Sequence, residues 1–498
     1  TLEITRQDDA LVGEVTGGSD VCEGQAQANG GLLLALVPRT CLDEAPEIRI
    51  AATMMYQPTE GGATAVDFTP DNSLTAPLPD DPPASPVCAN ATVEGDEQLT
   101  IRRLACGIGG TEPISQAVAT SQFVFDNPNT PAIDPYTAEW VVLARDDDFA
   151  DALAGSSLSF GQGPLLFTYS PTSSPTGRDP GRLADITRAE ILRSLPRGRT
   201  VYLLGGSAAL HPGLDAELED LGYEVVRFAG TGRENTARLI AHEVRRIVIQ
   251  FNEENGFPDV RMAFVVNRSN WPDAVLAGSV GAYWGMPILL TDVNDVHAET
   301  RAAIEELDID YIHIAGGTAV ISTPVLQELR TLVDGRQEPG VDLNDPNSPW
   351  YRFCVNPEGG PEYGCRWPGQ DRIGTAASVG QLNRDMLRRL GASHPFIPAD
   401  QQQFAAAINM RRENAFAFAL AAATVSGRFG GAVFLPAEGD NGDTLRDDVK
   451  FFTCPYIQDI REVVFIGDTD VLAPGFADQI RAHHADPTTS GFDPPCAS

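Results

Sequence analysis

The fold of this chain is decided by Trp-Pro-Asp-Ala-Val-Leu-Ala-Gly at residues 271–278, Met-Pro-Ile-Leu-Leu-Thr at 286–291 and Ile-His-Ile-Ala-Gly-Gly-Thr at 312–318. The same three elements return in an earlier copy that starts at Phe149 and in a later, eroded copy that starts at Phe416. Self-similar segments at long spacing are the signature of repeat architectures. We therefore expect three related units that form a scaffold or a binding protein, rather than an enzyme with a single site.

Within the first copy, apolar runs alternate with segments of helical periodicity. The runs typical of buried strands are 141–144, 164–168, 200–204 and 225–229. The segments expected to be helices are 151–158, 187–195, 212–221 and 234–248. Continuous apolar strands that alternate with helices indicate a parallel sheet covered on both faces, so we predict an α/β fold.

A second recurring element sets the unit boundaries. Gly-Thr-Gly-Arg-Glu-Asn-Thr-Ala at 230–237 aligns with Gly-Gln-Asp-Arg-Ile-Gly-Thr-Ala at 369–376 and, less well, with residues 110–117. These positions predict a first unit at 101–226, a second at 227–367, and a third with a C-terminal tail at 368–498. The second unit is longer because it holds an insertion at about 334–367, which contains Cys354 and Cys365.

Residues 1–100 have a different pattern. Short alternating stretches separated by Gly and Pro are typical of antiparallel strands, so we expect a small, sandwich-like all-β domain. The Pro- and Asp-rich run at 77–86 reads as a linker.

Cysteine usage points to an oxidising compartment. The eight cysteines include no C-x-x-C pair, which argues against a zinc ribbon and favours disulfides. Neighbouring cysteines suggest Cys22–Cys41, Cys88–Cys106, Cys354–Cys365 and Cys454–Cys496, although the sequence leaves the connectivity open. The start at Thr1, without a signal segment, fits either a processed secreted protein or a partial sequence.

The charge balance excludes several partners. The formal net charge is −34, and Lys450 is the single lysine. Nucleic acid needs a basic face, so it is not expected as a partner. No run of 18 or more apolar residues exists, so we expect no membrane insertion. The acidic surface suits a saline exterior, or it reflects a bias of Arg over Lys.

The linked motifs resemble the cell wall-binding repeat 2 family, whose pattern is an Arg-x-x-Thr-Ala element, a Phe-Ala-Asp-Ala-Leu element, a Pro-Ile-Leu-Leu-Thr strand and an Ile-Leu-Gly-Gly turn. The resemblance covers about residues 101–485 and is fullest in the second repeat. It implies three Rossmann-like units around a pseudo-threefold axis, in secreted and surface-layer proteins of Gram-positive bacteria. It also implies non-covalent binding of anionic wall polymers. The residues that match these motifs are the candidates for polymer binding or for contacts between units: Asp151, Gly205, Gly206, Arg233, Thr236, Asp273, Gly316, Gly317, Arg372 and Thr375.

The first repeat has lost both the Arg and the Thr of its first element, and two further positions in the third repeat depart from the family pattern. Pro113 replaces the Arg of the first repeat, Phe418 replaces the Asp of the third, and Asp468 replaces the second Gly of the third turn. The hydrophobic frame persists in every copy, so the predicted fold does not depend on these positions. The losses favour architecture over polymer capture, and they leave the second copy as the complete one.

Each motif has a structural and a functional interpretation. The Gly pairs at 205–206 and 316–317 follow strands but do not continue into G-x-G-x-x-G, which favours tight turns over a nucleotide site. Asp151 and Asp273 begin helices, where capping or docking of units is favoured over a ligand contact. Arg233 and Arg372 suit an ion pair between units and an anion-binding groove equally well.

No catalytic constellation is visible, and no cofactor is expected. Acidic loops at 146–148 and 438–443 have oxygen ligands suited to Ca²⁺, yet neither matches an EF-hand, so solvated loops are favoured. His483 and His484 are expected to be exposed. The basic spots available to an anionic polymer are Arg245-Arg246, Arg388-Arg389 and Arg411-Arg412.

The leading hypothesis is a secreted, non-enzymatic protein of the cell surface or cell wall. It would bind an anionic wall polymer or serve as a surface-layer component. The alternative is a homo-oligomeric or polymeric filament or lattice subunit that binds other copies of itself. A wall hydrolase hidden in the N-terminal region is the weaker alternative.

Overall fold

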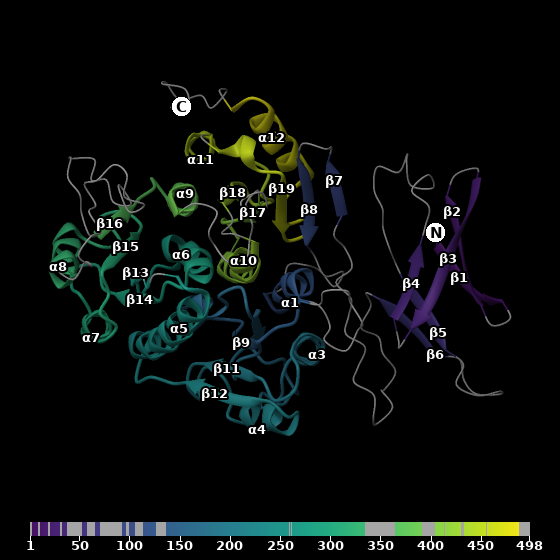
Figure 1. Ribbon diagram of the computed structural model, residues 1–498, viewed down its shortest axis with the longest axis horizontal. Coiled ribbons are helices and arrows are strands. Elements are labelled where there is room, and N and C mark those ends of the chain that lie inside the picture. The colour runs from purple at the N-terminus through teal and green to yellow at the C-terminus, as the bar shows by residue number, and fades with distance from the viewer. Residues whose placement is uncertain are drawn as a thin grey trace.

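The computed structural model (Figure 1) describes the backbone of strands β1 to β7 between residues 2 and 95. Beyond them it describes residues 99–104, 113–125, 136–257, 259, 261–333, 364–390, 404–412, 414–429, 433–454 and 456–487. The linker expected at 77–86 lies outside these residues. Cys454 is disulfide-bonded. The side chains of the other seven cysteines lie outside the description, so the four pairings stay predictions.

The N-terminal region contains antiparallel strands. One sheet follows sequence order: β1 (Leu2–Gln7), β2 (Ala10–Gly17), β3 (Asp20–Asn29) and β4 (Leu32–Leu36). A separate pair is formed by β5 (Ala52–Tyr56) and β6 (Ala65–Thr69).

The rest of the chain forms three parallel sheets, which confirms the predicted α/β fold. The first unit has the order β10 (Leu165–Thr168), β9 (Trp140–Arg145), β11 (Thr200–Leu204), β12 (Glu224–Phe228). The second has the order β14 (Ile288–Thr291), β13 (Met262–Asn267), β15 (Tyr311–Ala315), β16 (Gly364–Trp367). The third has the order β18 (Val433–Ala437), β17 (Phe404–Asn409), β19 (Glu462–Ile466), β8 (Thr100–Leu104), β7 (Thr92–Gly95).

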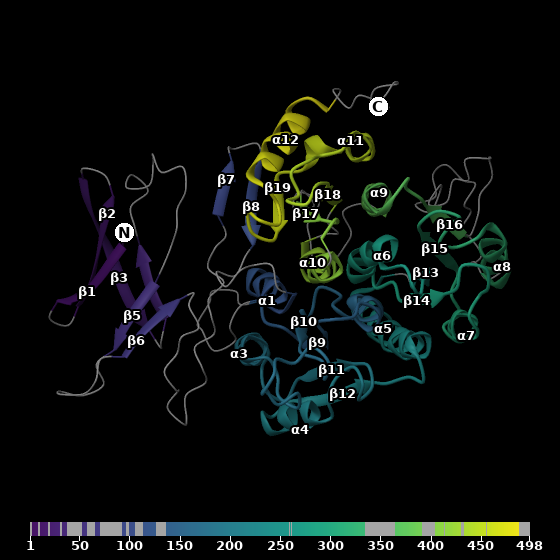
Figure 2. The same ribbon diagram turned by 180° about the vertical axis from the view of Figure 1, so that it is seen from behind.

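The third sheet takes its last parallel strand from the start of the repeat region. In the sequence, β8 lies at the start of the segment predicted as the first unit, yet it pairs in parallel with β19, so that Ile101 lies beside Val463. Strand β7 then pairs with β8 in antiparallel orientation and extends the sheet. The chain thus closes on itself, because the strand that begins the repeat region completes the third sheet (Figures 1 and 2).

Two sets of helices connect the sheets. The central helices follow strands β9, β13 and β17, and they are α2 (Ala150–Gly155), α6 (Trp271–Trp284) and α10 (Ala415–Phe429). The junction helices follow the last parallel strand of each sheet: α5 (Arg233–Asn255), α9 (Arg372–Leu390) and α1 (Pro113–Val124). Each junction helix packs on the central helix of its own unit. It also packs on the edge strand of the next unit, which is β14 for α5, β18 for α9 and β10 for α1.

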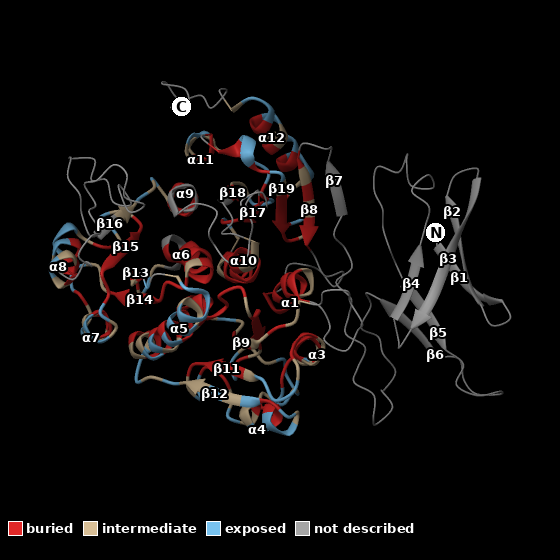
Figure 3. Ribbon diagram, viewed as in Figure 1, coloured by how far each residue is buried: buried red, intermediate tan, exposed pale blue. Residues whose placement is uncertain are grey.

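The remaining helices cover the outer faces. They are α3 (Asp185–Ser194), α4 (Gly213–Asp220), α7 (Ala298–Glu306), α8 (Thr323–Val333), α11 (Asp447–Thr453) and α12 (Pro474–Ala485). Figure 3 shows buried residues concentrated in the central helices and in most strands of the parallel sheets, and exposed ones on the outer helices α4, α7 and α8.

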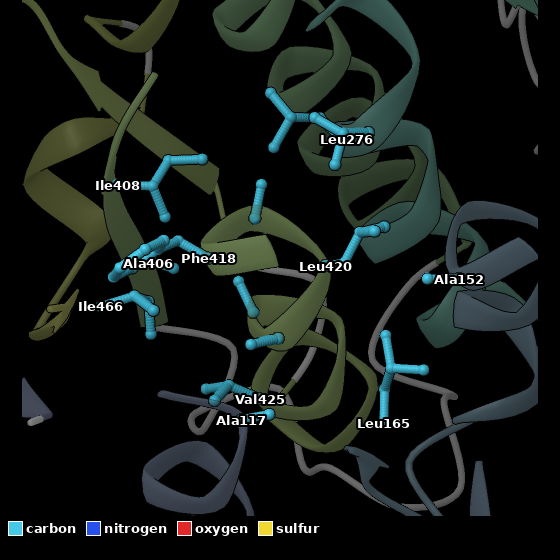
Figure 4. Packing of buried hydrophobic residues seen from close by; sticks show 14 of the residues in the cluster. Ala117, Ala152, Leu165, Leu276, Ala406, Ile408, Phe418, Leu420, Val425 and Ile466 are labelled. Atoms are coloured by element: carbon cyan, nitrogen blue, oxygen red, sulfur yellow. The ribbon is translucent and has the colours of Figure 1, made fainter. Parts of the chain in front are cut away.

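The hydrophobic core joins the three units at the central helices. Figure 4 shows side chains of α1, α2, α6 and α10 meeting those of β10, β17 and β19. The central helices α6 and α10 approach the segment after α2 closely because the contact residues are small. A Cβ on Gly427 would lie 2.7 Å from the backbone nitrogen of Gly161, and a Cβ on Gly278 would overlap the Ser156 hydroxyl. The small-residue pattern is therefore a packing requirement.

Candidate binding site at the unit junctions

Each junction helix with an Arg start begins after a tight glycine turn. In the first junction, between the first and second units, the Thr236 hydroxyl accepts a hydrogen bond from the Gly230 nitrogen at 3.1 Å. A Cβ on Gly230 or on Gly369 would overlap the backbone nitrogen of Thr236 or Thr375, respectively. Both threonines are buried. They lie inside the turns that begin α5 and α9, and these turns fix where each helix begins.

Arg233 is the first residue of α5 and contacts both units that meet there. Its Nη1 donates a hydrogen bond to the carbonyl oxygen of Arg268, just after β13, at 3.0 Å. On the first unit, its Nη2 lies 3.8 Å from Oδ2 of Asp148, and the guanidinium lies 5.9 Å from the ring centroid of Phe149. The side chain remains 35% exposed. The guanidinium is thus held by both units and still reaches solvent.

Asp151, in α2, is close enough to the same guanidinium for its charge to act on the carboxyl group. Its Oδ2 packs against Gly205, where an added Cβ would stand 2.6 Å away. Burial raises the pKa of this carboxyl to about 6, and the charge of Asp148 adds to the effect, while Arg145 and Arg233 oppose it. The junction therefore places one arginine among the carboxylates of the preceding unit.

The first glycine of each Gly-Gly turn has a structural role. Gly205, Gly316 and Gly467 have positive φ angles of 97°, 104° and 124°, which disfavour residues with a Cβ. Their backbone nitrogens donate hydrogen bonds to the last parallel strand, for example Gly205 to the carbonyl of Phe228 at 2.8 Å. Because these N–H groups are already bonded to backbone, the turns do not present them to a phosphate.

The second position of the turn is less restricted. A Cβ on Gly317 would meet nothing within 4 Å, and one on Gly206 would make an ordinary contact with Ala229. Neither residue has a positive φ. Asp468 occupies this position in the third unit, and its carboxylate accepts a hydrogen bond from the Asp470 nitrogen at 3.0 Å. The Gly-to-Asp departure is therefore compatible with the fold.

An arginine on the last parallel strand of every sheet supports these turns, and sequence reasoning missed it. Arg227 donates to the carbonyl of Gly205 at 3.0 Å, and Arg366 donates to that of Gly316 at 3.1 Å. In the third unit Arg103 donates to Gly467, Asp468 and Leu472. Each arginine is the next-to-last residue of its strand, and this shared position is the signal that could have revealed the set.

The second junction, between the second and third units, repeats the geometry of the first. Arg372 begins α9 and donates to the carbonyl of Met410, just after β17, at 3.4 Å. The Asp371 carboxylate forms ion pairs with Arg446 at 2.6 Å and with Arg411 at 3.3 Å. These contacts lower the pKa of the carboxyl group. The side chain of Asp273 lies outside the described residues. Its position near the start of α6 matches that of Asp151 in α2, and α6 is the helix on which α9 packs.

The third junction, which closes the ring, lacks both charged groups. Helix α1 begins with buried Pro113 in place of Arg, and it packs on α10, where Phe418 replaces Asp and is 1% exposed. The helix packing therefore brings the Arg position of each repeat to the same junction as the Asp position of the preceding repeat, and both substitutions fall on one junction. Sequence alignment alone shows them as unrelated losses in different repeats.

Other candidate residues have ordinary partners. In the described part of the chain, no group of three or more His, Cys, Asp and Glu side chains is placed to hold a metal ion. Asp146 and Asp147 accept hydrogen bonds from the hydroxyls of Ser173 and Ser170.

His483 and His484 are buried, contrary to the prediction of exposure. Their ring nitrogens lie 3.0 Å from the Thr453 hydroxyl and the Ile460 carbonyl, because this face of α12 packs inward. Burial lowers the pKa of His483 to about 4.

Comparison with known proteins finds a family match for two of the three repeats. The model of the family described as Cell wall binding domain 2 (CWB2) matches residues 107–214 and 227–326. Among solved structures, Cwp8 from Clostridium difficile is similar with a TM-score of 0.56 at 18% identity, covering 79% of this chain and 52% of that one. Cwp6 from the same organism has a TM-score of 0.50 at 13% identity, covering 93% and 56%.

Curated relatives match over shorter lengths. The N-acetylmuramoyl-L-alanine amidase LytC of Bacillus subtilis (strain 168) is 24% identical over 223 residues, which are 45% of this chain and 38% of that protein. An uncharacterised protein of Pyrococcus abyssi is 23% identical over 177 residues, which are 35% of this chain and 47% of that protein. The chain therefore spans less than half of the length of these relatives. None of the described helices is long and apolar enough to cross a bilayer.

Proposed function

Because the chain carries repeats of the cell wall binding domain 2 family, as its motifs predicted, we propose that it is a non-enzymatic cell-surface protein held non-covalently on an anionic wall polymer. The polymer would bind at the junctions between units. The observation that carries this proposal is the position of Arg233, which both units hold in place while it remains partly open to solvent.

The chemistry of Arg233 suits an anionic polymer. A guanidinium presents donors in a planar fork that matches phosphate and carboxylate groups. Its Nη2 lies 3.8 Å from Asp148, which is beyond hydrogen-bond distance, so an incoming anion can compete for this group. The backbone contact to Arg268 keeps the side chain oriented meanwhile.

The rest of the protein opposes such a partner. The net charge of −34 repels an anionic chain. Both arginines of one basic spot that the sequence offered are paired locally: Arg245 with Asp259 at 2.8 Å and Arg246 with Glu243 at 2.6 Å. Arg411 likewise lies between Asp371 and Glu438. Binding at a junction thus requires screening by salt or bridging by divalent cations.

Co-sedimentation with purified wall material, with and without Ca²⁺, tests the proposal. We expect retention of the wild type and at least tenfold weaker retention of Arg233→Gln. Arg246→Gln is the matched control, since it removes an exposed arginine of the same helix away from the junction. Loss of retention after chemical removal of the anionic polymer would identify the ligand class. No retention of the wild type under either condition rules out wall attachment.

Two other outcomes would assign a different role. Sedimentation of the protein without wall material would indicate the self-assembling filament or lattice instead. Clearing of wall material in a zymogram would indicate a hydrolase and would contradict the non-enzymatic assignment. The same retention experiment, carried out on whole cells, tests the surface-layer role.

A further inference from the structure

The three junctions have the same construction but not the same chemistry. In each, a helix follows the last parallel strand of one sheet and packs on the central helix of that unit. The same helix contacts the edge strand of the next unit, which is β14, β18 or β10. The first residue of the helix decides what the junction presents. It is Arg233 in the first, Arg372 in the second and Pro113 in the third.

The first two junctions keep a charged group at the surface. Arg233 and Arg372 are both partly exposed, and each donates to the carbonyl that follows the first strand of the next unit. An arginine of the next unit lies alongside and bridges two carboxylates in each case. Arg268 reaches Glu234 at 2.6 Å and Asp292 at 3.6 Å, and Arg411 reaches Glu438 at 2.7 Å and Asp371 at 3.3 Å. The two junctions therefore have the same arrangement of two arginines, one at the start of the junction helix and one in the next unit.

The third junction is buried instead. Every residue of α1 from Pro113 to Ser121 is buried, and Ala117 and Val118 are fully so. Phe418 fills the place of the junction carboxylate with a large apolar ring, and Figure 4 shows it in the cluster that also contains Ala117 and Val425. A charged group here would lose its hydration without gaining a partner. The two substitutions thus convert a polar junction into an apolar one as a pair.

From this difference we infer that the module has two polymer-binding junctions and one apolar seal, so that one chain binds two segments of anionic polymer and not three. The inference rests on the proposed function, because it assigns the number and place of its sites. The seal closes the ring, since α1 follows β8, the strand that completes the third sheet. The polymer would cross the module on the side of α5 and α9.

Calorimetric titration counts the sites. The probe is a size-fractionated anionic oligomer released from purified wall, too short to span two junctions, and the full chain is used. We expect two oligomers per wild-type chain, one for Arg233→Gln, one for Arg372→Gln, and none for the double variant. Arg233→Lys and Arg372→Lys keep the charge, so they should retain two sites with weaker affinity.

The seal is tested by a second measurement that needs no ligand. Phe418→Ala should lower the Tm by at least 5 °C and leave two sites per folded chain, whereas Arg233→Gln should change the Tm by less than half as much. Three sites in the wild type, or a site lost in Phe418→Ala, would overturn the inference while leaving wall binding intact. An unchanged Tm in Phe418→Ala would overturn the seal. No binding by the wild type would overturn the inference together with the proposed function.

Discussion

Asp151 is a residue whose environment opposes its ionisation. Its pKa is raised to about 6 in the folded chain, mainly by burial, against an ordinary value of 3.8. A carboxyl group whose pKa is higher in the folded state than in the unfolded state stabilises the fold at pH values below its pKa in the unfolded state. This stabilisation is lost as the pH rises through its pKa in the folded state. Between about pH 4 and 6 this contribution disappears, and at pH 7 the ionised group is a net cost of up to about 3 kcal/mol, at about 1.4 kcal/mol per pKa unit. A carboxylate kept under such a cost is more easily explained by binding than by folding.

The prediction at this scale concerns Asp151→Asn. The amide has a similar shape and no charge, so the variant should have a higher Tm than the wild type at pH 7, by a few degrees, and an equal Tm at pH 4. Thermal unfolding at the two pH values checks this. A lower Tm at pH 7 would mean that attraction to Arg233 outweighs the burial of the carboxylate.

Residue roles were only partly predictable from the sequence. Arg233 and Asp151 were identifiable because they match linked motifs, but their meeting across a junction was not, since the motifs place them in different repeats. Arg103, Arg227 and Arg366 were missed because the turn carbonyls that they support lie far along the chain, so only their shared next-to-last position on the strands signals them. His483 was misjudged because a histidine pair near the chain terminus is often exposed, whereas tertiary packing buries this one.

At the scale of elements, the strand pair β7–β8 matters most. The family match begins at residue 107, yet the third sheet needs Thr100–Leu104 beside β19. Ile101 and Leu104 are buried, and Arg103 donates to three carbonyls of the third unit. Without β8, the edge of β19 and the turn at Gly467 lose their partners. The folded module therefore starts earlier in the chain than the repeat motifs do.

Two truncations test this view of the module. A chain that starts at residue 92 should unfold in one cooperative transition at a Tm close to that of the full-length module. A chain that starts at residue 107 should lose at least 10 °C or fail to unfold cooperatively, because it exposes a buried strand edge. Differential scanning calorimetry distinguishes the two. Equal transitions in both chains would show that the third unit folds without β8.

Elements and their order followed from periodicity, while ring closure did not. The apolar runs at 141–144 and 200–204 became β9 and β11 because continuous apolar strands leave few alternatives. The pairing of β8 with β19 joins residues more than 350 positions apart, as Arg102 and Glu462 show with a contact at 2.6 Å. No local pattern specifies a partner at that distance, so the sequence favoured three consecutive units.

For the whole molecule, charge decides how the junctions meet a polymer. The net charge of −34 acts over the Debye length, which is about 30 Å at 0.01 M salt and about 8 Å at 0.15 M. A contact between Arg233 and a phosphate acts over a few Å and is screened less. Salt should therefore weaken the repulsion between protein and polymer before it weakens binding at the junctions.

Wall retention of this chain should accordingly rise from about 0.01 M to about 0.3 M NaCl and fall only at higher salt, unlike that of a basic wall-binding protein, whose retention falls throughout. Co-sedimentation across this range checks the expectation. The double variant Arg233→Gln/Arg372→Gln is the control, because it keeps the repulsion and loses the contacts, so its retention should stay low at every salt concentration. A steady decline for the wild type would mean that long-range attraction dominates, and that a basic surface outside the described residues carries the binding.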